Sequence, residues 1–301
     1  MASQNDSSAS FVLYRYTPSI PAAAIFTAVF IILAIVHTYL AIRHRSKYFI
    51  PFIIGLLFEA AGYIARIFSH YDTLALGPYI VQTMLILVAP PLFAASIYMT
   101  LGRLILYLDA ESASLLRVKY IAKIFVVGDI ISFLLQCGGG GYMSAGSLSA
   151  MEDGAHVVIA GLAVQLLFFG FFIIASAIFH YRVKTNPQYY TDSRQVVSSS
   201  SLRRDSWECM LWCIYGACVL ILIRSIYRVV EFVEGNDGFV MHLEYLLYIF
   251  DAVLMALQAM LLLVGYPGRV LGGGKRNDGG VPLEERADSA EGFLGRGKGA
   301  V

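Results

Sequence analysis

Seven stretches of this chain are almost entirely apolar, and each has more than 20 residues. A helix of about 20 residues crosses the ~30 Å hydrocarbon core of a bilayer. Only 14% of the residues are charged, well below the ~25% typical of soluble domains. The sequence therefore predicts an all-α integral membrane protein built as a seven-transmembrane-helix bundle. The predicted spans are residues 20–42, 49–69, 79–107, 120–140, 155–181, 207–232 and 242–266.

The basic residues gather in alternate connections between these spans. Lys and Arg are concentrated on the cytosolic side of membrane proteins. The connections after the first, third and fifth spans and the segment after residue 266 are rich in them, whereas 70–78, 141–154 and 233–241 contain none. The segment before the first span has only Arg15. This alternation predicts an N-terminus outside the cell and a cytosolic C-terminus.

The segments that flank the transmembrane domain, residues 20–266, are predicted to be tails. Residues 1–19 would form an extracellular N-terminal tail, with a glycosylation sequon at Asn5. Residues 267–301 are rich in glycine and mixed charge, which predicts a disordered cytosolic tail. The first span is not preceded by a basic stretch and has no cleavage site, so we expect it to remain as an uncleaved anchor.

The sequence offers little that indicates catalysis. Its four cysteines form no CxxC and its six histidines form no HxxxH, so we expect neither a metal site nor a disulfide framework. The glycines at 138–141 lack the GK[ST] ending of a phosphate loop. A net charge of +1 gives no reason to expect a nucleic-acid partner. We therefore expect no catalytic residue, no metal and no cofactor.

Two prolines, Pro90 and Pro91, fall in the middle of the third predicted span. Proline lacks the N–H that would bond the carbonyl four residues earlier in a helix. Inside a bilayer no water replaces that donor, so neighbouring groups must satisfy the freed carbonyl. The pair predicts a kinked helix with freed backbone carbonyls.

Three short stretches place charges four or seven residues apart inside the apolar runs. They are Glu59, Tyr63 and Arg66; Arg224, Arg228 and Glu231; and Glu244, Tyr248 and Asp251. At about 100° per residue, each trio spans about 60° of helix circumference and forms one polar stripe. A charged side chain at the bilayer centre costs roughly 3 kcal/mol on insertion scales. The stripes must therefore face one another or an aqueous cavity.

Other polar residues extend this pattern. Asp129 and Gln136 share one face of the fourth span, and Gln165 lies within the fifth. Together with the three stripes they predict an outward-biased polar chamber that reaches the midplane. Two interpretations stay open for any single pair, namely an interhelical ion pair that locks the bundle or a group that binds a ligand.

The count of charges favours a ligand for part of this set. Five acids face three arginines within the predicted spans, and an excess of two buried acids needs either protonation or a cationic ligand. Asp129 and Glu59 have no nearby arginine in the sequence, so they are the candidates for the unmatched charge. The predicted substrate-binding residues are Glu59, Tyr63, Arg66, Asp129, Gln136, Gln165, Arg224, Arg228, Glu231, Glu244, Tyr248 and Asp251.

These residues belong to an ordered series of motifs between about residues 16 and 266. The series is Tyr16-Thr-Pro18, Glu59-x-x-Gly62-Tyr63-x-x-Arg66, Ala89-Pro90 followed by Tyr98 and Arg103, Asp129-x-x-Ser132-x-x-x-Gln136-x-Gly138-Gly-Gly140, Gly161 with Gln165, Arg224-x-x-Tyr227-Arg228-x-x-Glu231, and Glu244-x-x-x-Tyr248-x-x-Asp251. In this order the motifs resemble the fungal RTA-like family of seven-span membrane proteins, also called lipid-translocating exporters.

The resemblance implies a multi-pass protein of the fungal plasma membrane that exports or translocates lipid-like amphiphiles. Its partners would be membrane lipids or amphiphilic small molecules, among them sphingoid bases, porphyrins and sterol-like or toxic amphiphiles, and it would act in stress or drug resistance. The alternative is a seven-span receptor or sensor for an amphiphilic ligand. No acidic residue precedes Arg103 directly, as it would in a G-protein-coupled receptor, and the seventh span has no lysine for a retinal Schiff base. A membrane enzyme ranks third because the histidines lie mostly near span ends.

Overall fold

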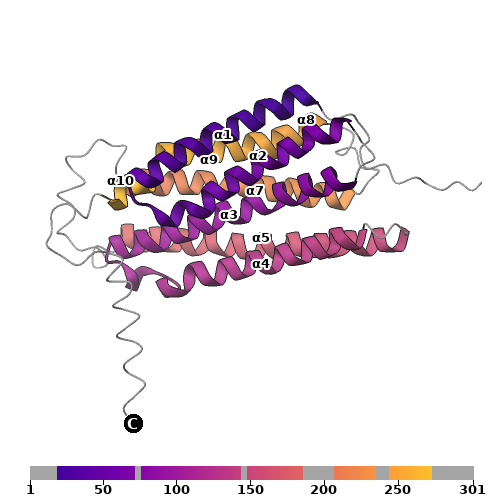
Figure 1. Ribbon diagram of the computed structural model, residues 1–301. Coiled ribbons are helices and arrows are strands. Elements are labelled where there is room, and N and C mark those ends of the chain that lie inside the picture. Colours follow the sequence, from indigo (N-terminus) through magenta and orange to yellow (C-terminus); the bar gives the residue numbers. More distant parts are fainter. Residues whose placement is uncertain (1–18, 72–75, 144–147, 186–206, 235–243, 273–301) are drawn as a thin grey trace, which may run out of the picture.

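The computed structural model of the protein describes residues 19–71, 76–143, 148–185, 207–234 and 244–272. The regular structure in these ranges is helical, and the long helices lie side by side (Figure 1). The elements are α1 (Ile20–Arg43), the 3-10 turn η1 (Lys47–Phe49), α2 (Ile50–Tyr71), α3 (Leu76–Tyr107), the 3-10 turn η2 (Glu111–Ala113), α4 (Val118–Met143), α5 (Leu148–Thr185), α7 (Trp207–Glu234), α8 (Glu244–Leu247), the π-helical turn η7 (Tyr248–Val253), α9 (Leu254–Val264) and α10 (Pro267–Gly272).

The long helices form a closed ring that follows the chain order. Each long helix packs on the next one in the order α1, α2, α3, α4, α5, α7 and α9, and α9 packs back on α1. Figure 1 shows α4 and α5 as a pair on one side of the bundle, with α1 and α9 on the opposite side. The ring brings α2, α7 and the last helix around a common interior, although they are far apart in the sequence.

Six segments are long and apolar enough, by length and composition, to cross a membrane. They are Ile20–Arg43, Lys47–Tyr71, Ile80–Tyr107, Glu152–Thr185, Trp207–Glu234 and Glu244–Leu271. The last of these combines α8, η7, α9 and α10 in one path. The remaining long helix, α4, has 26 residues and packs along α5. The helices thus follow the predicted spans, and the described residues form an all-helical structure with several segments suited to crossing a membrane.

The distribution of side chains is the reverse of that in a soluble protein. Large apolar residues point outward on the long helices, among them Ile35 at 63% and Leu167 at 73% exposure. Charged residues such as Glu59 and Arg66 are instead buried at 0% and 1% exposure. A soluble protein rarely buries such charges and exposes few broad apolar surfaces. The outer surface is therefore suited to lipid.

Two short turns connect helices at one end of the bundle. After α1, Arg45 takes a positive φ of 51°, and the Ser46 N–H donates to the Ala41 carbonyl at 2.8 Å. After α3, Asp109 takes a φ of 49°, and the Ala110 N–H donates to the Ile105 carbonyl. In both turns a left-handed residue lets the chain reverse while it caps the last carbonyls of the helix.

The end of the domain differs from the sequence prediction, because residues 267–272, assigned there to the tail, form α10. Pro267 occupies the first helical position, where its fixed φ favours helix initiation. Val270 and Leu271 are buried in the core, which stabilises this short helix. The tails at 1–18 and 273–301, and with them the sequon at Asn5, lie outside the described residues.

Candidate functional site

Three ion pairs among the described residues lie around one interior region, which we call the charged cluster, and two of them join different helices. Its members are Glu59, Tyr63 and Arg66 from α2, Arg224, Arg228 and Glu231 from α7, and Glu244, Tyr248 and Asp251 from α8 and η7. Arg66 pairs with Glu244 at 3.0 Å, Arg228 pairs with Glu231 at 2.7 Å, and Arg224 pairs with Asp251. Each predicted arginine thus meets a different predicted acid.

Arg66 connects α2 to two residues of the last span. Its Nε donates to the Tyr248 hydroxyl at 3.0 Å, and its Nη2 donates to Oε1 of Glu244. The same Glu244 oxygen accepts the backbone N–H of Ser19 at 2.8 Å, directly before α1 begins. Phe26 of α1 stacks on the Tyr248 ring with centroids 5.4 Å apart. Arg66, Glu244 and Tyr248 therefore join α1, α2 and the last span at the same end of the bundle.

Arg224 satisfies a carbonyl that a proline has freed. Pro90 lies inside α3 and has no N–H for the carbonyl of Ile86, four residues earlier. Nη2 of Arg224 donates to this carbonyl at 2.9 Å. The guanidinium also pairs with Asp251 on η7. The predicted freed carbonyl is thus a docking point for α7 on α3, and it fixes where Arg224 lies.

Glu59 is the acid of the charged cluster that has neither a hydrogen bond nor an ion pair among the described residues. Its side chain is fully buried on α2, and neither carboxyl oxygen is hydrogen-bonded among the described residues. It interacts electrostatically with Asp251, Arg224 and Arg228, although Arg224 and Arg228 make their short contacts with other acids. An isolated carboxylate in an apolar interior is costly, so this group needs a proton or a cation.

Asp129 and Gln136 of α4 and Gln165 of α5 make up a second set of buried polar residues, which we call the α4–α5 group. The Gln136 amide donates to the Gln165 carbonyl oxygen at 3.0 Å. Ser132 donates to the backbone carbonyl of Asp129 at 2.8 Å. A glycine at 161 allows this close approach, because a Cβ there would lie 2.8 Å from the Ser132 carbonyl oxygen. The predicted chamber residues are therefore held in two groups by different helices.

The π-helical turn η7 places two members of the charged cluster. Tyr248 and Asp251 both lie in it and are buried, whereas the flanking segments are ordinary α-helix. π-helical turns have i→i+5 hydrogen bonds and occur frequently at functional sites. The wider turn changes which side chains of the last span face α2 and α7.

Some groups in these contacts were not part of the predicted site. The Ser19 N–H and the ring of Phe26 meet Glu244 and Tyr248, and the sequence gives no charge or spacing that marks them. Tyr98 is fully buried and interacts with Asp129, and it was noted only within the family motifs. Within the described ranges no group of three His, Cys, Asp or Glu residues could hold a metal ion.

Comparison with known proteins places the chain among fungal membrane proteins. A family model described as "RTA1 like protein" matches residues 52–274. "Protoporphyrin uptake protein 1" of Saccharomyces cerevisiae is 38% identical over 85% of this chain and 92% of the relative. "Protein RTM1" of the same species is 35% identical, over 87% and 94%. "Sphingoid long-chain base transporter RSB1", also from this yeast, is 25% identical over 79% and 68%. No solved structure matches the chain significantly.

Proposed function

The chain belongs to the family of RTA1-like proteins, and from this premise we propose that it exports lipid-like amphiphiles or translocates them across the membrane. Relatives named for sphingoid long-chain base transport and protoporphyrin uptake support an amphiphilic cargo. These two cargoes share a polar part and a large apolar part. The proposed cargo is a sphingoid base or a sterol-like or toxic amphiphile.

The observation that carries this proposal is the presence of two buried acids beyond the three ion pairs. The pairs use Glu231, Glu244 and Asp251, whereas the carboxyl oxygens of Glu59 and Asp129 have no hydrogen-bond partner among the described residues. Purely structural ion pairs would not require the extra acids, whose burial is unfavourable. A transport pathway for a polar head group explains why such acids lie inside an otherwise apolar bundle.

The proposed topology has seven spans, with α4 as the fourth, the N-terminus outside and the C-terminus in the cytosol. The alternation of basic residues supports this orientation, and the ring-like packing of α4 between α3 and α5 supports its membrane position. In this topology the Arg66–Glu244 contact lies toward the outer side. The polar head of the cargo would contact residues of the charged cluster and the α4–α5 group, and the plasma membrane is the proposed location.

Transport can be tested with a labelled sphingoid base in yeast cells that lack the endogenous relatives. Cells that express the protein should lose the label faster and tolerate more of the toxic base than cells with an empty vector. Asp129→Asn and Arg228→Ala, at matched surface expression, should reduce this difference. No effect of the wild-type protein on any amphiphile tested would refute the transport function, and a signalling response to the base without its movement would favour the receptor alternative. Normal transport by both variants would refute the proposed pathway.

A further inference from the structure

Asp129 differs from the other buried acids in its surroundings. Its side chain is 3% exposed, and both carboxyl oxygens lack a hydrogen bond among the described residues. The polar side chain found to interact with it is Tyr98 of α3, whose hydroxyl lies near the carboxyl but outside hydrogen-bond geometry. A buried carboxyl that lacks a hydrogen bond and lies next to a hydroxyl, which can also accept one, is suited to a group that carries several N–H bonds.

Three aromatic rings continue from this carboxyl toward the end of the bundle. Tyr98 packs on Phe172 of α5 with ring centroids 4.5 Å apart and on Phe125 of α4 at 5.3 Å. Phe125 and Phe172 meet edge to face, also at 5.3 Å. Phe125 precedes Asp129 by one helical turn, so the rings lie directly beside the acid along α4.

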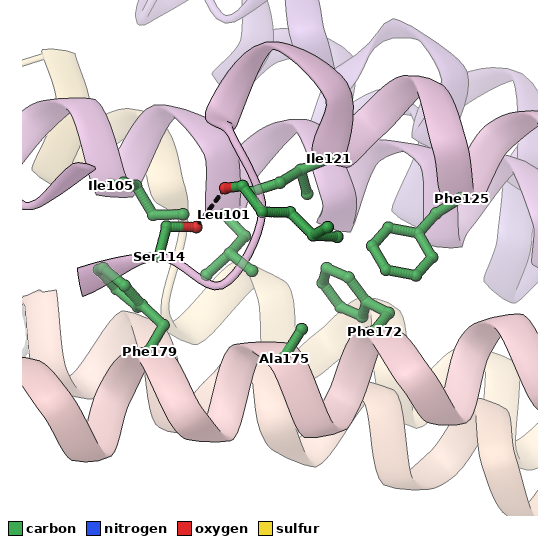
Figure 2. Close-up of a pocket in the computed structure, with 9 residues that line it drawn as sticks. Leu101, Ile105, Ser114, Ile121, Phe125, Phe172, Ala175 and Phe179 are labelled. Carbon is green, nitrogen blue, oxygen red and sulfur yellow. Dashed lines mark hydrogen bonds between the residues drawn. The ribbon is translucent and has the colours of Figure 1, made fainter. Parts of the chain in front are cut away.

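An apolar pocket begins where these rings end (Figure 2). Phe125 and Phe172 form one of its walls, and Leu101, Ile105, Ile121 and Phe179 line much of the rest. In Figure 2 these side chains, which come from α3, α4 and α5, converge beside the segment that carries Ser114. The pocket itself has room for about one water molecule. Binding of a longer chain therefore requires the connection between α3 and α4, which closes the pocket, to move outward.

Asp129 and the apolar pocket thus lie along the same stretch of α4. From Asp129 to Ile121 the distance along α4 is about 12 Å at 1.5 Å per residue. We propose that Asp129 and Tyr98 bind the ammonium head of a single-chain amphiphilic amine, with its alkyl chain in the apolar pocket between α3, α4 and α5. This proposal rests on the proposed transport function. Within the pathway proposed above, the ammonium head is recognised at Asp129, where the described structure offers no competing guanidinium contact.

Equilibrium binding of radiolabelled dodecylamine to the purified full-length protein in nanodiscs tests this site. Asp129→Asn should weaken dodecylamine binding by about tenfold to a hundredfold, the range expected for a charge-assisted hydrogen bond. Binding of dodecanol, which has the same chain without the charge, should not change. Asp153→Asn, at an exposed acid of α5, is the matched control and should bind as wild type. Asp129→Glu, which keeps the charge, should retain more binding than Asp129→Asn.

Filling the pocket tests the position of the chain separately. Ala175→Phe places a ring in the pocket and should weaken binding of both dodecylamine and dodecanol at least fivefold, with a smaller effect on hexylamine. Ala177→Phe, on the exposed face of the same helix, is its control. Wild-type affinity in Asp129→Asn, or equal losses of hexylamine and dodecylamine in Ala175→Phe, would overturn the inference. Amphiphile efflux by the wild-type protein alongside either result would leave the transport function intact and refute only this site.

Discussion

The contact between α4 and α5 allows a sharp test, because two adjacent glycines have opposite surroundings. A Cβ at Gly139 would lie 2.6 Å from the Gly154 carbonyl oxygen and 2.8 Å from the Val158 backbone nitrogen. A Cβ at Gly138 would meet nothing within 4 Å. Both positions gain helix propensity on change to alanine, about 0.5–1 kcal/mol each. Only Gly139→Ala forces two backbones apart.

Overpacking of this kind costs about 1–3 kcal/mol, so Gly138→Ala and Gly139→Ala should differ in stability by about that amount. At about 2–4 °C for each kcal/mol in a chain of this size, Gly139→Ala should melt roughly 6 °C below Gly138→Ala. Thermal unfolding of the two purified variants in the same detergent measures this difference in melting temperature. The gain in helix propensity is common to both variants, so it cancels from the comparison. Equal melting temperatures would refute the close approach of α4 and α5.

The charged cluster yields two further expectations. Glu59→Gln should leave the melting temperature unchanged or raise it, because the Glu59 oxygens have no hydrogen-bond partner to lose. Asp251→Asn should instead lower the free energy of unfolding by about 3 kcal/mol, because it breaks the pair with Arg224. Equal losses of stability in the two variants would contradict the role of Glu59 as an unpaired acid. Arg66→Met should destabilise strongly, and adding Glu244→Met should recover most of that loss, since the second change removes the acid left unpaired. A double variant less stable than Arg66→Met would contradict this pairing.

Much of the helix layout follows from hydropathy alone, because burial in lipid imposes the same requirement along each span. The ends are less predictable. The fifth helix was expected at 155–181, but α5 extends from Leu148 to Thr185. Glu152 and Asp153 are exposed and remain helical beyond the apolar run. Hydropathy reports where a helix meets lipid, not where its hydrogen bonds end.

The sequence indicates which polar residues face the interior, but not which groups they contact there. The spacing of charges identified Arg224 as a residue that must face the interior, and Pro90 indicated that a carbonyl of the third span would be free. Neither feature reveals that Arg224 bonds the Ile86 carbonyl, because this contact depends on how α3 and α7 pack. Likewise, Glu59 has no close arginine in the sequence, yet the fold places Arg224 and Arg228 within electrostatic reach of it.

The division of the polar residues into two groups also comes from tertiary structure. Asp129 and Gln136 share a face of α4 with the same periodicity as the other stripes, so the sequence joins them to one chamber. The ring order of the helices instead directs Gln136 toward Gln165 on α5. The turn η7 has no sequence signal of this kind, since the spacing of Tyr248 and Asp251 fits an ordinary α-helix equally well.

This π-helical turn sets the orientation of everything that precedes it in the last span. An i→i+5 turn accommodates about one residue more than α geometry does over the same rotation. If the turn closed to α geometry at constant length, the preceding segment would rotate by about 100° relative to α9, and Glu244 would turn away from Arg66. Deleting one residue between Tyr248 and Val253 would instead keep the orientation of Glu244, because the shorter α-helical turn has about the same total rotation. The extra residue of the turn therefore decides which carboxylate meets which arginine.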